Sequence, residues 1–149
     1  MADKKISQLT DATTLTGAEQ IPMVQSGSTV KTTVQDLVGK MIVVAKTATA
    51  GESVDLDSST YANAQMIKLT WSGSSGTATY TLPSASDSTN RKMRFISDST
   101  FSSNTHVDIT PASGDNLDGS ISAYRINKAY EGIAVWSDGT EWFVIQKKA

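Results

Sequence analysis

Apolar residues follow two different rhythms along the chain, and the change between them falls near Gly39. Before it, single large apolar residues are separated by threonine, serine and glycine, and no helical stripe runs through the stretch. From about Ala64 onward, apolar and polar residues alternate in short runs that end at glycine or proline. The contrast predicts an N-terminal arm over residues 1–38, a connecting β segment over 39–63 and a C-terminal β domain over 64–149.

Within the arm, residues 20–25 and 29–33 are expected to form two short strands around the turn at 26–28. Residues 33–38 are expected to form one helical turn, with Thr32 or Thr33 as its N-cap. So few spaced apolar side chains cannot bury much surface alone. We therefore expect the arm to pack on the rest of the chain, on further copies of it, or on a partner.

The remainder of the chain reads as a series of short strands joined by turns. The strands are expected over residues 41–45, 53–57, 66–71, 77–82, 93–97, 106–110, 120–126, 132–137 and 140–146. Asp138-Gly139, between two such runs, is the strongest local hairpin signal. Seven to nine short strands predict a mainly β fold, a compact antiparallel β-sandwich or barrel-like domain.

Composition narrows the possible functions. The chain has 149 residues, of which 38% are apolar, and its 20 serines and 19 threonines favour turns and strands. The net charge is −2 and the basic residues occur at most in pairs, so we expect no nucleic-acid partner. There is no cysteine and no apolar run long enough for a signal peptide or a membrane span. We expect a product made in the cytoplasm without membrane insertion.

Candidate chemistry is sparse. The single histidine, His106, lies on the polar phase of a strand with no nucleophile motif nearby, so it is interpreted as an exposed strand residue. The acidic loop from Gly114 to Gly119 has oxygen ligands but not the spacing of a calcium loop, and a tight turn is the preferred interpretation. We therefore expect no catalytic residue, no metal, no cofactor and no enzymatic activity.

Aromatic residues offer the alternative of a binding site. Trp136 and Trp142 are an even number of positions apart across the expected hairpin, which suggests that both lie near one face. That arrangement would form either a core layer or a platform for stacking on sugar rings. With Tyr124, they are the candidate contacts to a ligand or receptor.

The N-terminal segment resembles a family of bacteriophage proteins. The residues that carry the resemblance are 5–10 (KISQLT), 15–19 (LTGAE), 21–27 (IPMVQSG) and 29–37 (TVKTTVQDL). They are similar to the N-terminal segment of head-fibre, head-decoration and tail-fibre subunits of tailed phages, with Met23 where valine is common. In the family this segment lies at the particle-proximal end. The resemblance implies anchoring to the particle by Ile6, Leu9, Leu15, Ile21, Pro22, Val24, Val30 and Leu37.

The C-terminal part resembles a looser pattern of phage fibre domains. Its landmarks are residues 81–83 (TLP), 94–96 (RFI), 109–111 (ITP), 114–119 (GDNLDG) and 136–142 (WSDGTEW). The resemblance implies a homotrimer located in the virion, with capsid, neck or tail proteins as further partners. The leading hypothesis is a short head fibre or capsid-decoration subunit. The alternatives are a tail-fibre or receptor-binding module that contacts a host surface glycan and, third, a depolymerase.

Overall fold

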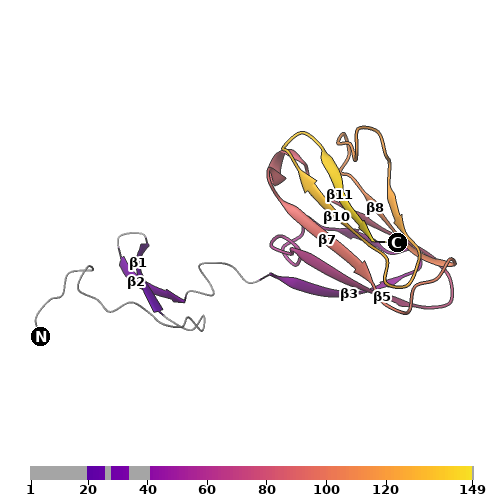
Figure 1. Cartoon of the computed structure of the whole chain (residues 1–149), viewed down its shortest axis with the longest axis horizontal. Helices are drawn as coiled ribbons and strands as arrows, with labels where there is room; N and C mark the ends of the chain where they lie inside the picture. Colours follow the sequence, from indigo (N-terminus) through magenta and orange to yellow (C-terminus); the bar gives the residue numbers. More distant parts are fainter. Residues whose placement is uncertain (1–19, 26–27, 34–40, 149) are drawn as a thin grey trace, which may run out of the picture. The chain divides into compact units, whose positions relative to one another are not determined.

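The computed structural model describes residues 20–25, 28–33 and 41–148 of the chain. The chain divides into two units, Met1–Lys40 and Met41–Ala149. In the first unit, β1 (Gln20–Gln25) and β2 (Ser28–Thr33) form an antiparallel hairpin in which Gln25 pairs with Ser28 (Figure 1). The two strands expected in the arm are thereby confirmed. The helical turn expected over 33–38 lies outside the described residues.

The second unit, here called the β unit, is built from two sheets of unequal size (Figure 1). The five-stranded sheet contains β3 (Val43–Thr49), β5 (Met66–Ser72), β7 (Lys92–Ser97), β10 (Gly132–Ser137) and β11 (Trp142–Lys148). The four-stranded sheet contains β4 (Ser53–Asp55), β6 (Gly76–Thr81), β8 (Thr105–Thr110) and β9 (Tyr124–Ile126). A short 3₁₀ turn, η2 (Ser86–Ser88), precedes β7. The mainly β fold class is confirmed.

The strand pairing differs from the antiparallel sandwich expected. From β3 to β8 the chain changes sheet after every strand, so successive strands within one sheet run in the same direction. The pairs β3–β5, β5–β7, β4–β6 and β6–β8 are parallel, and only β9, β10 and β11 add antiparallel pairs. The run at 72–76 is therefore a crossing between sheets. Alternation along each strand is the same in both arrangements, so it could not tell them apart.

The chain passes back and forth between the two sheets without a repeat of fixed length in the sequence, and the strand register explains why. Val43 of β3 pairs with Met66 of β5, whereas Met66 pairs with Arg94 of β7. The segment from β5 to β7 is therefore longer than the segment from β3 to β5. The segment 39–63 is also no mere connection. From Met41 onward it belongs to the β unit, and it supplies β3 and β4, one edge strand of each sheet.

The core lies between the two sheets. Ile67 and Leu69 of β5 and Met93 and Phe95 of β7 point inward from the larger sheet and are at most 2% exposed. From the smaller sheet they meet inward-facing residues of β6 and β8, namely Ala78, Tyr80, Val107 and Ile109. Burial of one such large apolar side chain contributes about 1.5–3 kcal/mol. In the part of the chain that the structure describes, none of the helices has the length and apolar character needed to cross a bilayer.

Candidate functional site

The outer face of the five-stranded sheet carries a group of exposed basic side chains. Along β7, Met93 and Phe95 point into the core, so Lys92 and Arg94 point outward. The same alternation turns Lys68 outward on the neighbouring strand β5. The exposed basic residues of this outer face are Lys68, Lys92, Arg94 and Lys148, which we call the basic face.

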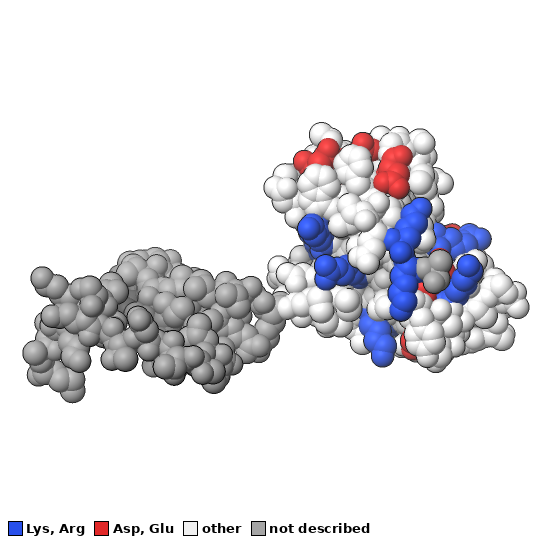
Figure 2. All heavy atoms as spheres, in the orientation of Figure 1, with Lys and Arg blue, Asp and Glu red and all other residues white. Residues whose placement is uncertain are grey.

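The basic face has no acidic counterpart on its own sheet. None of the five strands, all of them within the described residues, contains an aspartate or glutamate. Figure 2 shows lysine and arginine side chains spread over the middle of the β unit, with one group of acidic side chains at its upper end and a few others near the basic ones. The two ion pairs among the described residues, Lys46–Glu52 and Arg125–Asp108, involve none of these cations. The guanidinium of Arg94 reaches only a sulfur, that of Met41 at 3.8 Å.

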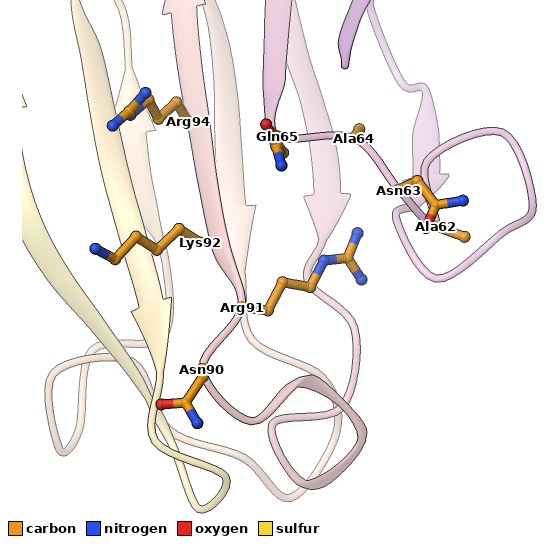
Figure 3. Close-up of a pocket in the computed structure, with 8 residues that line it drawn as sticks. All are labelled: Ala62, Asn63, Ala64, Gln65, Asn90, Arg91, Lys92 and Arg94. Atoms are coloured by element: carbon orange, nitrogen blue, oxygen red, sulfur yellow. The ribbon is translucent and has the colours of Figure 1, made fainter. Parts of the chain in front are cut away.

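A depression of about 560 Å³ adjoins the basic face where β5 and β7 begin. Amides and cations line it: the lining residues are Ala62, Asn63, Ala64, Gln65, Asn90, Arg91, Lys92 and Arg94. Figure 3 shows Lys92 and Arg94 projecting to one side of the chain and Arg91 pointing the other way, toward Asn63. The volume of the depression lies in the range of small-molecule sites. A ligand with negative charge and hydroxyl groups would find hydrogen-bond donors on both sides of the depression.

Arg91 is the most constrained of the lining cations. Its Nη2 donates a 2.8 Å hydrogen bond to the carbonyl oxygen of Tyr61, which ties the start of β7 to the segment before β5. Burial lowers the pKa of the Arg91 guanidinium, and the nearby carboxylate of Asp57 opposes that shift. An arginine retains its charge at neutral pH. The depression therefore contains the bonded, partly buried charge of Arg91 in addition to the exposed charges of Lys92 and Arg94.

Trp136 borders the basic face. It pairs across the strands with Lys92 on one side and with Phe143 on the other, and it is partly exposed. The rings of Trp136 and Phe143 lie 5.9 Å apart with an interplanar angle of 32°. An aromatic ring beside a cation gives a ligand an apolar surface next to a charge.

The other two aromatic candidates, Trp142 and Tyr124, do not lie beside the basic face. Trp142 is fully buried, and its Nε1 donates a 2.9 Å hydrogen bond to the carbonyl oxygen of Pro83, so it has no surface to offer a ligand. Trp136 and Trp142 lie on opposite faces, which overturns the expectation of a shared one. Tyr124 lies on β9 of the other sheet, where Lys147 Nζ is 5.1 Å from its ring centroid.

The reason for the opposite faces is the pairing in the β10–β11 hairpin. Ser137 pairs with Trp142 and Trp136 with Phe143, so paired residues are an odd number apart. Paired residues share a face, and residues an even number apart therefore lie on opposite faces. The aromatic pair of the outer face is thus Trp136 with Phe143.

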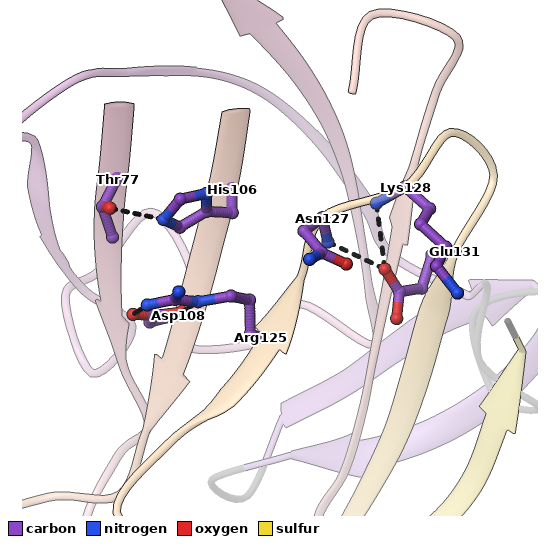
Figure 4. Close-up of polar contacts among 7 residues, drawn as sticks. All are labelled: Thr77, His106, Asp108, Arg125, Asn127, Lys128 and Glu131. Atoms are coloured by element: carbon purple, nitrogen blue, oxygen red, sulfur yellow. Dashed lines mark hydrogen bonds and ion pairs between the residues drawn. The ribbon is translucent and has the colours of Figure 1, made fainter. Parts of the chain in front are cut away.

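His106 lies on the outer side of the four-stranded sheet (Figure 4). Its Nε2 and the Thr77 hydroxyl are 2.6 Å apart, and its Nδ1 is buried without a hydrogen-bond partner. The nearby Asp108 accepts two hydrogen bonds from Arg125, at 2.7 and 2.8 Å. A histidine that acts as a base needs an orienting partner and a nucleophile within reach. The Thr77 hydroxyl lies within reach of Nε2, but among the residues drawn in Figure 4 none bonds to Nδ1 to orient the ring.

The acidic loop at 114–119 uses its carboxylates to hold the backbone. Asp115 Oδ2 accepts a 2.7 Å hydrogen bond from the amide of Ala85, and Asp118 Oδ1 accepts a 2.8 Å bond from the amide of Val144. Gly119 donates to Glu141 at 2.9 Å. Within the described residues, no group of three or more histidine, aspartate and glutamate side chains is placed to share a metal ion. The turn interpretation fits these contacts.

Another carboxylate organises the loop between β9 and β10. Glu131 is 6% exposed, and its Oε2 accepts hydrogen bonds from the amides of Asn127 and Lys128, at 2.8 and 3.0 Å (Figure 4). A buried carboxylate with two backbone donors is fully engaged in structure. It is therefore not a candidate for binding or proton transfer.

The expected anchoring residues fall partly on described strands. Ile21, Pro22 and Val24 lie on β1, and Val30 lies on β2. In the hairpin, Val24 pairs with Thr29. The expected anchors Ile6, Leu9, Leu15 and Leu37 lie outside the described residues.

No protein-family model matches the chain, and no curated protein sequence matches it.

Proposed function

We propose that this chain is a structural subunit of a bacteriophage particle, a short head fibre or capsid-decoration protein. In this proposal residues 1–38 attach to the particle and the β unit projects outward. The observation that carries the proposal is the division of the chain into Met1–Lys40 and Met41–Ala149. The resemblance of the first unit to phage N-terminal segments adds the direction: the first unit binds the particle.

The β unit suits a projecting role because it has its own core. Among the residues whose burial the structure describes, 41–148, those of the main apolar cluster lie between Ala48 and Trp142. A unit with a separate core can stay folded when the other segment is engaged elsewhere. The proposed assembly is a homotrimer, in keeping with the resemblance.

Deletion of residues 1–38 tests the attachment role. The truncated chain should retain the circular dichroism and cooperative unfolding of the β unit but should no longer co-purify with particles. The full chain should co-purify in stoichiometric copies. Attachment that survives the deletion would contradict the proposal.

Solution mass tests the assembly. Light scattering after size exclusion should give about three times the chain mass of 15.8 kDa for the full chain. A fragment that begins at Gly39 then assigns the contacts: if it is also trimeric, the β unit organises the trimer, and if it is monomeric, the first unit does. A monomer for both would contradict a trimer that forms without the particle.

A second candidate function is a tail-fibre or receptor-binding module for host adsorption. The depression lined by Asn63, Gln65, Arg91 and Arg94 favours it, since convergent polar donors in a concave site are typical of ligand recognition. The two functions are compatible. Cell staining by labelled chain lacking residues 1–38 tests this one, and absence of staining on the true host would remove it.

A further inference from the structure

We propose that the basic face and the depression beside it bind an acidic polysaccharide, a polymer whose sugar units carry carboxylate groups. The inference deepens the receptor-binding alternative but does not require the chain to be a virion subunit. It rests on the charge of one sheet, the donors of the depression and the position of one aromatic pair.

The charge of the five-stranded sheet favours an anionic ligand. The strands of the five-stranded sheet contain lysines and one arginine but no carboxylate. Like charges on neighbouring strands repel one another. Arg94 lies one strand from Lys68 and beside Lys92, and within the described residues no carboxylate forms an ion pair with any of them, although Asp98, just beyond the end of β7, is near enough to Lys68 to attract it. An approaching anion would relieve that repulsion, and arginine binds a carboxylate with two parallel hydrogen bonds.

The second step is that the ligand also carries hydroxyl groups. The side chains of Asn63, Gln65 and Asn90 are exposed and line the same depression as the cations. An amide side chain offers both donors and an acceptor, which suits a hydroxyl because a hydroxyl is also both. A simple anion would use only the cations. A sugar acid would use both kinds of group.

The third step is the aromatic border. Trp136 is the cross-strand neighbour of Lys92, so a ring bound over Trp136 would place its substituents beside that ammonium group. Phe143 extends the apolar surface on the other side. The apolar face of a sugar ring fits such a surface, whereas its charged edge fits the lysine.

The fourth step is that the ligand is a polymer. The basic residues continue beyond the depression, since Ile96 pairs with Gly132 and Gly132 pairs with Lys148 across the sheet. A second, mainly apolar hollow of about 130 Å³ lies along that path, over Gly132 and Ala134. A single sugar would fill the first site only. A chain of sugar acids would meet cations along the face.

A nucleic acid fits less well. Proteins that bind single strands stack successive bases on several aromatic side chains. Here one aromatic pair borders the face, and the whole chain carries a net charge of −2, which opposes approach of a densely charged phosphate backbone.

Affinity electrophoresis of the full chain tests the proposal, with polygalacturonate as the probe polymer. In native gels at pH 7, polygalacturonate should retard the protein, neutral dextran should not, and added salt should weaken the retardation. Unretarded protein in polygalacturonate would overturn the proposal. So would retardation by dextran to the same degree, or binding to duplex DNA as tight as to polygalacturonate.

Two matched variants locate the site. Arg94→Gln should weaken polygalacturonate binding about tenfold, the scale of one charge-assisted hydrogen-bonded contact. Arg125→Gln makes the same change of charge on the other sheet, and its binding should equal that of the wild type. Lys92→Gln serves as a second probe of the face if Arg94→Gln unfolds. Equal loss in the Arg125 variant, or no loss in the variants of the face, would overturn the assignment.

Discussion

The two faces of the five-stranded sheet are made from the same strands but carry opposite kinds of residue. The inner face presents Met93, Phe95 and Trp142, each at most 2% exposed. The outer face presents Lys92 and Arg94 with no acidic partner on the sheet. The inner face stabilises the fold, because its apolar surface is removed from water. The outer face leaves charges unpaired, and that is where a partner can gain binding energy.

The outer side of the four-stranded sheet differs, because its charged groups are paired within the molecule. There Arg125 is held by Asp108 in a two-bond ion pair, and His106 is engaged by Thr77. Hydroxyls of Thr81 and Thr110 bond each other at 3.3 Å. Apart from the buried Nδ1 of His106, the polar groups named here have partners within the molecule. The contrast indicates that unpaired charge on the larger sheet is a local property, since the same chain pairs its charges elsewhere.

The largest expected effect is a loss of stability that distinguishes two tryptophans of one hairpin. One of them lies on the inner face of the sheet and the other on the outer face. Trp142→Ala should lower the free energy of unfolding by about 3–5 kcal/mol, because it leaves a cavity and removes the bond to Pro83. Trp136→Ala should cost less than half as much, since that ring is partly exposed, but it should weaken polygalacturonate binding. Urea unfolding and affinity electrophoresis measure the two. Equal destabilisation by both would erase the distinction between the faces.

A second effect tests the one place where the outer face is closely packed. A Cβ added at Gly132 would lie 2.3 Å from the carbonyl oxygen of Phe95, well inside contact distance. Gly132→Ala should therefore destabilise the protein by about 1–3 kcal/mol through overpacking. Gly114→Ala, at a position with open space, is a contrasting variant whose cost comes from its positive φ alone. Thermal unfolding of both variants makes the test, and an unaffected Gly132→Ala variant would contradict the close approach.

Much of this architecture was open to prediction because alternation within one strand is a local signal. The run from Lys92 to Ser97 alternates visibly, and its inward and outward residues follow directly. Which strands become neighbours is not local. The chain changes sheet at each crossing, so the parallel pairing of β5 with β7 could not be seen in the sequence.

The same limit hid the candidate site. Lys68 and Arg94 are far apart in the sequence, and only the order of strands in the sheet brings them to one face. The sequence showed basic residues at most in pairs and suggested no basic surface. The available signal was that strands of alternating pattern carried only basic charges, as in Lys92 and Arg94 of β7. The error over Trp136 and Trp142 had a different origin, because in a hairpin the pairing, not the sequence separation, decides the face.

A smaller effect concerns the paired face. Arg125→Gln removes the ion pair with Asp108. In that pair the side chain of Arg125 is 52% exposed. Exposed ion pairs contribute little to stability, so the free energy of unfolding should change only slightly. Asp108→Asn should behave alike, and the double variant should show that the two effects are not additive. A double-mutant cycle by urea unfolding measures the coupling, and a loss as large as that of Trp142→Ala would contradict the view of this pair as a surface contact.

The smallest expected effect is a loss of stability at acid pH, which comes from carboxyl groups in loops and not from either face of the sheet. The hydroxyl of Thr140 and the amides of Glu141 and Thr140 hold the pKa of Asp138 below its usual value. For Asp98, burial acts to raise the pKa, but hydrogen bonds from Thr100 and Thr70 outweigh it and the pKa is lowered. A lowered pKa in the folded state gives stability that is present above the unfolded pKa, near 3.8, and is lost as the pH falls through the folded value.

The melting temperature should therefore decline slightly below about pH 4, and the decline should shrink in the double variant Asp98→Asn/Asp138→Asn. Because both carboxyl groups lie near solvent, the change should be smaller than that of any core variant. Differential scanning calorimetry between pH 7 and pH 2 measures it. A decline of the same size in the double variant would show that other carboxylates control the acid response.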